Sequence, residues 1–116
     1  MTRVVVESPY AGSLKRNEAY AKAAVLDCLY RGEAPIASHL LYTQEGILRD
    51  AHPIERKLGI AAGHAWISVC NRVVVYIDYG WSTGMRAGVE VAKAANIPVE
   101  IRRLPVKVLT RIDGLG

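Results

Sequence analysis

Short runs of consecutive apolar residues, separated by segments with helical spacing, constrain the fold of this chain most strongly. Residues 3–7 and 73–77 contain uninterrupted β-branched side chains, which is typical of strands buried on both faces. Residues 35–38 and 98–101 are shorter runs that we interpret as two further strands. Because continuous apolar strands occur mainly in parallel sheets, the pattern predicts an α/β fold built on a parallel sheet.

Two amphipathic helices are predicted between the first three strands, since apolar residues recur there every three or four positions. We interpret Asn17 as the N-cap of the first helix, which should end near Gly32. The second helix should begin at Pro53 and continue to about residue 69. It contains Gly59 and Gly63, which allow a neighbouring element to approach closely.

A third helix should follow the strand at residues 73–77, with Ser82 or Thr83 as its cap and its end near Asn96. Residues 102–116 form a C-terminal tail, in which the apolar stretch 106–109 is interpreted as an additional edge strand. The whole chain, residues 1–116, is thus predicted to be one domain with a core at about 3–101. Its parallel sheet would have four to five strands and helices on both faces.

Three loops of this predicted fold should meet at one edge of the sheet. Right-handed crossovers place every strand-to-helix loop on the same side, and ligands of such sheets bind beyond the carboxyl ends of the strands. The loops are residues 7–17, 38–52 and 78–83, and polar and aromatic residues are concentrated in them. We interpret residues 39–50 as a long functional loop.

The turn before the third helix gives the sharpest indication of a ligand. A helix N-terminus presents unpaired N–H groups and a partial positive charge. Ser82, Thr83 and Gly84 would add hydroxyls and an approachable backbone, and Arg86 a cation, so that a phosphate or carboxylate is stabilised. The alternative is that the two hydroxyls only cap the helix. Asp78 is interpreted as a ribose or base ligand, a general base, or a simple turn residue.

The other two loops supply further candidate residues. Glu7 ends a strand and is either a carboxylate of the cleft or part of an exposed strand end. His39 directly follows a strand and is a candidate general acid or base, although a single histidine is more often structural. His64 lies in mid-helix and receives no role. The remaining expected ligand contacts are Ser8, Tyr10, Asn17, Tyr42 and Met85. Of these, Tyr10 would either stack on a base or line a pocket.

Composition excludes several classes of protein. The net charge of +4 is modest and scattered, which favours an anionic small ligand or simple solubility over nucleic-acid binding. Cys28 and Cys70 lie in apolar patterns without a CxxC motif, so we expect buried thiols, a reducing cytoplasm and no metal site. The chain begins on a strand pattern and has only short apolar runs, so we expect neither a signal peptide nor membrane contact.

Two familiar nucleotide motifs are also missing. The sequence contains neither GxxxxGK[ST] nor GxGxxG, which argues against standard mononucleotide hydrolysis and against a dinucleotide cofactor. No Ser–His–Asp or Cys–His arrangement is evident from the spacing either. We therefore expect no bound cofactor.

Several segments resemble the nucleoside 2-deoxyribosyltransferase-like superfamily, particularly its small, often phage-encoded members. They are Ser8-Pro9-Tyr10 after the first strand, residues 17–21, residues 37–44, and Asp-Tyr-Gly-Trp-Ser-Thr-Gly-Met at 78–85 opening a helix. The resemblance covers residues 3–101 and implies a Rossmann-like or flavodoxin-like domain that binds nucleosides or nucleotides. It implies a homo-oligomer, a dimer or higher, with pockets near the subunit interfaces. A phage-encoded member would act in the cytoplasm of a bacterial host.

One position departs from the family. The transferases carry a nucleophilic Glu in the helix after the last loop, four residues beyond the loop glycine, and counting from Gly84 this position is Gly88. The nearest carboxylate of that helix is Glu90, and two helical residues rotate a side chain by about 200°, so Glu90 should face elsewhere. The resemblance places Tyr10 near the sugar and Asp78 near the base or ribose.

Three functions follow as hypotheses. The first is a nucleotide-binding protein without transferase chemistry, which would sequester a nucleotide signal. The second is a hydrolase or glycosyltransferase that acts on an N-glycosidic or phosphodiester bond, with Glu7, His39 or Asp78 replacing the missing Glu. The third is a structural or interaction domain with a vestigial pocket. Whether the chain is an enzyme stays open at this point.

Overall fold

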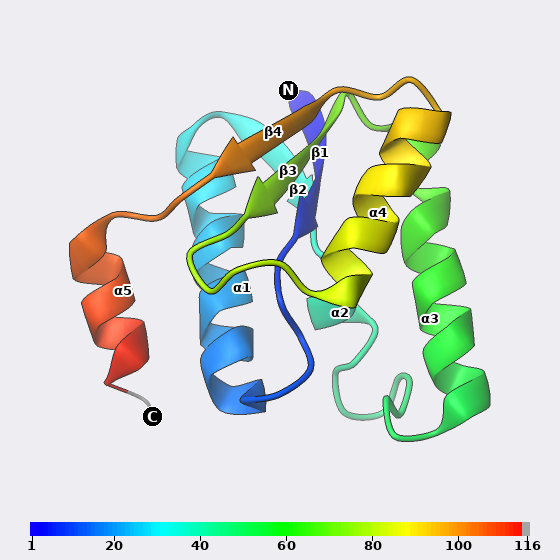
Figure 1. Ribbon diagram of the computed structural model, residues 1–116, viewed down its shortest axis with the longest axis horizontal. Helices are drawn as coiled ribbons and strands as arrows, with labels where there is room; N and C mark the ends of the chain where they lie inside the picture. Colours follow the sequence, from blue (N-terminus) through cyan, green and yellow to red (C-terminus); the bar gives the residue numbers. More distant parts are fainter. Residues whose placement is uncertain (115–116) are drawn as a thin grey trace.

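Four parallel strands form the centre of the computed structural model, which describes residues 1–114 (Figure 1). They are β1 (Thr2–Glu7), β2 (Glu33–Ile36), β3 (Arg72–Tyr76) and β4 (Val99–Arg102), in the order β2-β1-β3-β4. In the register, Val5 of β1 lies opposite Ile36 on one side and Val73 on the other. The chain changes direction of travel across the sheet between β1 and β3, and ligands of open α/β sheets bind at such a switch point.

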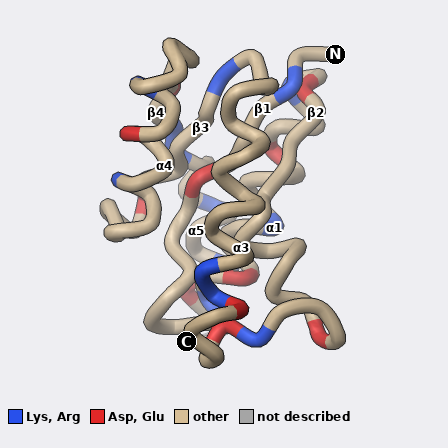
Figure 2. The backbone as a smooth tube through the Cα atoms, turned by 90° about the vertical axis from the view of Figure 1, so that its right-hand side faces the viewer, with Lys and Arg blue, Asp and Glu red and all other residues tan. Residues whose placement is uncertain are grey.

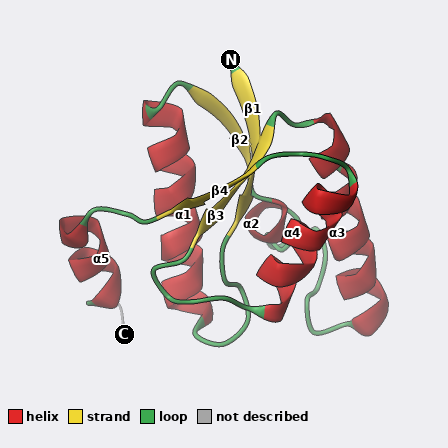
Figure 3. Ribbon diagram, turned by 45° about the horizontal axis from the view of Figure 1, so that its top comes forward, coloured by secondary structure: helices red, strands yellow, loops and turns green. Residues whose placement is uncertain are grey.

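Helices cover both faces of this sheet (Figures 1 and 3). One face carries α1 (Leu14–Tyr30) and the C-terminal α5 (Val106–Asp113), and the other carries α3 (Pro53–Ala65) and α4 (Thr83–Ala94). A short α2 (Ser38–Leu41) follows β2, and a single 3₁₀ turn, η1 (Ile67–Val69), follows α3. The predicted α/β fold of Rossmann-like or flavodoxin-like type is confirmed, with four strands in the sheet.

Two apolar layers result from the alternation of side chains along the buried strands. Val4 and Val6 pack with Tyr20, Ala24 and Cys28 on the α1 side. On the opposite side, β1 and β3 pack against α4 and η1, through the buried set Val5, Ile67, Val73, Val75, Met85 and Ala92. Because successive strand residues point to opposite faces, a continuous valine run serves both layers at once.

The beginning of α1 differs from the prediction. The helix starts at Leu14 after Ser13, and Asn17, predicted as the N-cap, lies buried inside its first turn. Asn17 Nδ2 donates hydrogen bonds to the carbonyl oxygens of Tyr10 (3.0 Å) and Ala11 (2.9 Å). The capping assignment was wrong because this side chain ties down the preceding loop, a tertiary role that local capping rules cannot reveal.

The C-terminal tail also differs from the prediction. Residues 106–109 belong to α5 and form no edge strand, so β4 ends the sheet. Leu104 and Ile112 are buried against the α1 side of the sheet, with Val108 and Leu109 partly buried beside them. A four-residue apolar stretch does not distinguish a strand from one turn of a buried helix.

Other boundaries moved by a few residues. The second predicted helix ends at Ala65 and its last turn becomes η1, while the loop predicted at 39–50 begins with the turn of α2.

Figure 2 shows Lys and Arg interspersed with Asp and Glu along the described chain, as the scattered charge of the sequence suggested. Within residues 1–114, none of the helices has the length and apolar character needed to cross a membrane.

Candidate functional site

A cavity of about 650 Å³ lies where the carboxyl end of β1 faces the start of α4. Its walls come from the loop after β1, from α2 and the segment behind it, from α3, and from the first turns of α4. The predicted meeting of the three loops is therefore confirmed. Most predicted site residues line this cavity: Glu7, Ser8, Tyr10, His39, Tyr42, Ser82, Thr83, Gly84 and Met85.

Asp78 is not among the residues that line the cavity. Its Oδ2 accepts hydrogen bonds from Tyr20 Oη (2.5 Å) and from the backbone N–H of Leu104 (2.9 Å). The Asp78 backbone N–H in turn donates to Tyr20 Oη at 2.9 Å. The carboxylate thus connects the end of β3 to α1 and to the segment before α5, on the side of the sheet away from the cavity.

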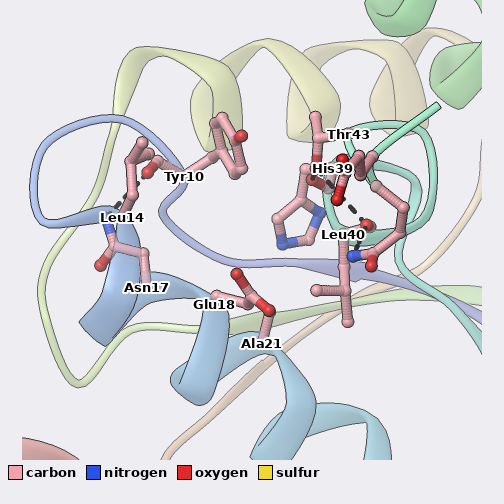
Figure 4. A pocket seen from close by; sticks show the side chains of 10 residues that line it. Tyr10, Leu14, Asn17, Glu18, Ala21, His39, Leu40 and Thr43 are labelled. Atoms are coloured by element: carbon pink, nitrogen blue, oxygen red, sulfur yellow. Dashed lines mark hydrogen bonds between the residues drawn. The ribbon is translucent and has the colours of Figure 1, made fainter. Parts of the chain in front are cut away.

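Two other predicted ligand contacts also lie elsewhere. Arg86 is exposed, and its guanidinium lies 5.5 Å from the centroid of the Trp81 ring rather than in the cavity wall. Asn17 lines a second, smaller cavity of about 170 Å³ (Figure 4). Tyr10, His39 and Thr43 line both cavities, so the two spaces adjoin at these side chains.

The turn before α4 forms a capped helix start beside the cavity. Gly80, with φ of +84°, provides the left-handed residue that the turn requires. Ser82 is the N-cap, and its Oγ accepts a hydrogen bond from the Met85 backbone N–H at 3.2 Å. The Ser82 hydroxyl is therefore engaged in capping, whereas Thr83 and Gly84 are exposed at the helix start.

Glu7 ends β1 with its side chain on the α4 side of the sheet. No other side chain or N–H group among residues 1–114 forms a hydrogen bond or ion pair with its carboxyl. Burial raises the pKa of this carboxyl from 4.5 to about 8. A Cβ atom at Gly88 would overlap the carboxyl, lying 2.6 Å from Glu7 Cδ. The absence of a side chain at Gly88 thus creates the space in which the Glu7 carboxyl sits.

Ser8 and His39 form a hydrogen-bonded pair in the wall of the same cavity. Ser8 Oγ and His39 Nε2 are 2.7 Å apart, and Ser8 is buried. Burial lowers the pKa of His39 to about 4, so its imidazole is neutral at neutral pH. A neutral imidazole both donates and accepts hydrogen bonds, which makes this pair suited to a hydroxyl or amide of a ligand and to proton transfer.

The wall contributed by α3 was missed in the sequence. Arg56, Gly59, Ile60 and His64 line the cavity at spacings of three, one and four residues. Leu58, one of the apolar residues that recur at helical spacing in this segment, is 58% exposed instead. The stripe at 56, 59, 60 and 64 was a detectable helical pattern, but its arginine and histidine did not resemble a core-facing set.

The predicted role of the two α3 glycines is confirmed. A Cβ atom at Gly63 would lie 2.9 Å from Ser38 Cβ in α2, and one at Gly59 would lie 3.2 Å from Leu48 Cδ1. The glycines let α2 and the following loop pack directly on α3. Behind them, Trp66 Nε1 donates a hydrogen bond to Tyr42 Oη at 2.8 Å, which holds one wall of the cavity. In residues 1–114, no group of three or more His, Cys, Asp or Glu side chains is placed to hold a metal ion.

Comparison with protein families gave a match over most of the chain. Residues 2–102 match the model of a family described as a domain of unknown function (DUF7768), which includes every strand of the sheet. Comparison with the curated proteins gave no match.

Proposed function

The chain belongs to the DUF7768 family, and we propose that it binds a nucleoside- or nucleotide-type small molecule in the cavity at the carboxyl end of the sheet. One observation carries the proposal: three loops bring aromatic rings, uncharged hydrogen-bonding groups and a helix start to a single cavity of about 650 Å³. A cavity of this volume falls within the usual range for small-molecule sites of about 300–1,000 Å³.

The groups around the cavity match the parts of a nucleotide. Tyr10, Tyr42 and Trp81 offer aromatic surfaces for a base. Ser8 and His39 offer a neutral hydrogen-bonding pair for sugar hydroxyls or base edges. The resemblance to the nucleoside 2-deoxyribosyltransferase-like superfamily supports the same ligand class.

An anionic group of the ligand has two places to bind. The exposed start of α4 offers N–H groups and the positive end of the helix dipole. Across the cavity, Arg56 of α3 supplies a guanidinium, whereas Arg86 does not line the cavity. For a phosphate-bearing ligand we therefore assign the larger loss of affinity to Arg56→Ala and the smaller one to Arg86→Ala.

We further propose that the protein is a homo-oligomer with its cavities near subunit interfaces. The support is the outer surface of α3, where Ile54 is 74% and Leu58 is 58% exposed, on the helix that forms a cavity wall. Light scattering of the purified protein should give a dimeric or larger mass that falls for Leu58→Glu. A monomeric mass at all concentrations would contradict this.

Calorimetric titration with adenosine, guanosine, cytidine, uridine and their 5′-monophosphates tests the binding proposal. We expect saturable binding of at least one of these compounds at one site per chain. Absence of binding for the entire panel would contradict the proposal. A protein that binds without turnover would sequester its ligand, and mass spectrometry should then recover the compound unaltered after denaturation.

Cleavage of an N-glycosidic or phosphodiester bond is a second candidate function. It is favoured by the presence of two proton-transfer groups in the cavity wall, Glu7 with a pKa near 8 and His39 with a pKa near 4. Gly88 stands where the nucleoside 2-deoxyribosyltransferases carry their nucleophilic Glu and offers no nucleophile itself. Cleavage would therefore rely on Glu7 and His39. Chromatography of the incubated panel should reveal cleaved product, and Glu7→Gln and His39→Ala should each lower the rate. Full rate in both variants would exclude these assignments.

A further inference from the structure

The Glu7 carboxyl borders the cavity, and no group among residues 1–114 forms a hydrogen bond or ion pair with it. Ser8 and His39, which line the same cavity, are hydrogen-bonded to each other, with Ser8 Oγ and His39 Nε2 2.7 Å apart. Burial raises the pKa of this carboxyl, and within residues 1–114 no hydrogen bond or charge contributes to the rise. The carboxyl therefore borders the cavity with its bonding capacity unused.

Its place is fixed by packing rather than by polar contacts. Glu7 leaves β1 toward α4, where the backbone of Gly88 provides the room that any larger residue would take away. Gly88 is buried within α4, a helix interior in which glycine costs about 1 kcal/mol relative to alanine. The space that Gly88 leaves for the Glu7 carboxyl accounts for a glycine at this position despite its cost.

We propose that Glu7 binds the nucleoside as a neutral acid, donating a hydrogen bond to an acceptor atom such as a ring nitrogen or carbonyl of the base. Gly88 is the positioning residue that keeps the carboxyl at the cavity wall. This inference rests on the proposed nucleoside binding and adds to it the chemical preference of the site. The site then selects ligands that present an acceptor at this point.

The protonation state follows from the surroundings of the carboxyl. An unpaired carboxylate that is withdrawn from water is costly, so burial raises the pKa of Glu7 to about 8 and the carboxyl keeps its proton below that pH. From α4, the element packed directly on it, Gly88, Met85 and Ala87 contribute no charge. The titratable or charged groups that face the same cavity from the other elements are Tyr10, His39, Tyr42, Asp50, Glu55, Arg56 and His64.

Adenosine is a suitable probe, because it has several ring-nitrogen acceptors and no group that ionises between about pH 6 and pH 9. Its affinity should be constant below the Glu7 pKa and should fall by up to about tenfold per pH unit above it. Glu7→Gln keeps a donor at the same place without a titratable proton. Its affinity for adenosine should stay within about threefold of the original and lose this pH dependence, whereas Glu7→Ala should bind at least about tenfold more weakly.

A ¹³C NMR titration of the Glu7 carboxyl in the free protein separates this inference from the proposed function. Adenosine binding together with an ordinary, acidic Glu7 titration overturns the inference alone. The same holds if Glu7→Gln binds as weakly as Glu7→Ala, or if affinity rises with pH, because the carboxylate would then be the binding form. Absence of binding for every nucleoside and nucleotide overturns the proposed function, and the inference with it.

Discussion

Glu7 and Gly88 illustrate how two residues far apart in the sequence define one feature of the candidate site. The sequence marked Glu7 as a carboxylate at a strand end and Gly88 as a departure from the family pattern, but not their contact. Only the packing of α4 on β1 shows that the glycine makes room for the carboxyl. A contact of this kind depends on how α4 is rotated about its own axis. The periodicity of apolar residues in the sequence does not determine that rotation accurately enough to predict the contact.

Alanine at position 88 should destabilise the protein through overlap with Glu7. We expect Gly88→Ala to lower the free energy of unfolding by about 1–3 kcal/mol, measured by urea denaturation. The double variant Gly88→Ala/Glu7→Ala should recover most of this loss, because the atoms that meet the new Cβ belong to Glu7.

Gly84→Ala is the matched control within the same helix. Its new Cβ would meet only Ser82 Oγ at 3.9 Å, an ordinary contact. Stability should stay the same or rise slightly, since alanine is the better helix former. Equal losses in both variants would contradict the packing role of position 88.

Asp78 is a residue for which the sequence suggested a contact with a ligand, whereas the structure shows hydrogen bonds within the protein. The family resemblance and its place at a strand end suggested a ligand contact, yet its carboxylate bonds Tyr20 and the backbone of Leu104. Burial and the hydrogen bond to Asp78 raise the pKa of Tyr20 above its usual range. A polar residue at the start of a loop can bind a ligand or stabilise the fold. The sequence does not distinguish these roles, because they depend on which groups the side chain contacts in the folded protein.

Removing the Asp78 carboxylate should therefore reduce stability. Asp78→Ala leaves Tyr20 Oη and the Leu104 N–H without their acceptor, at an expected cost of about 1–3 kcal/mol. Asp113→Ala is the control, since Asp113 accepts an exposed hydrogen bond from Tyr79 and should cost less than about 1 kcal/mol. Denaturation curves that rank the two variants in reverse order would refute the structural role of Asp78.

Among the elements, the long apolar strands and the starts of α3 and α4 were predicted more accurately than the start of α1 or the inward faces of the helices. The strand predicted at 73–77, observed as β3 at Arg72–Tyr76, and the helix that begins at Pro53 follow from local composition. The inward face of α3 could not be derived in this way, because only Gly63 of this helix is buried and its apolar residues include exposed ones. Its contribution to the cavity wall was missed for the same reason.

The element that replaces the predicted edge strand, α5, should contribute to stability through its buried side. Ile112 is 5% exposed and packs in the α1-side layer, so Ile112→Ala should cost about 2–4 kcal/mol in urea denaturation. Val106 begins the same helix at 78% exposure, and Val106→Ala should change stability by less than about 0.5 kcal/mol. Near-equal effects would show that α5 is not docked on the sheet.

At the scale of the whole molecule, topology was the most predictable property. Alternation of continuous apolar strands with helices allows few arrangements, and parallel strands bring their carboxyl ends to one edge. The position of the main cavity at the carboxyl edge of the sheet therefore agrees with the predicted parallel arrangement, even though Asn17, Asp78 and Arg86 do not line that cavity. Which residues line the cavity depends on how the helices pack on the sheet, and local sequence patterns say little about that packing.

The free energy of unfolding should depend on pH through the titration of Glu7. The folded-state pKa of about 8 lies above the ordinary 4.5, so the folded state retains a proton that the unfolded state has lost between these values. The free energy of unfolding should therefore fall as pH rises from 4.5 toward 8 and level off above. Glu7→Gln removes this loss, and should be the more stable protein at pH 8.5 by more than about 1 kcal/mol. A pH-independent difference between the two proteins would argue against a buried, neutral Glu7.

The most direct test of nucleoside binding in this cavity compares two tryptophan substitutions on α4 by calorimetric titration. Ala87 lines the cavity, whereas Ala94 is exposed near the end of the same helix and does not. The compound of the panel that binds the unmodified protein should bind Ala94→Trp with the same affinity and should lose at least about tenfold in affinity for Ala87→Trp, since the indole fills the cavity. Equal affinity of both variants for that compound would contradict the assignment of the cavity as the binding site.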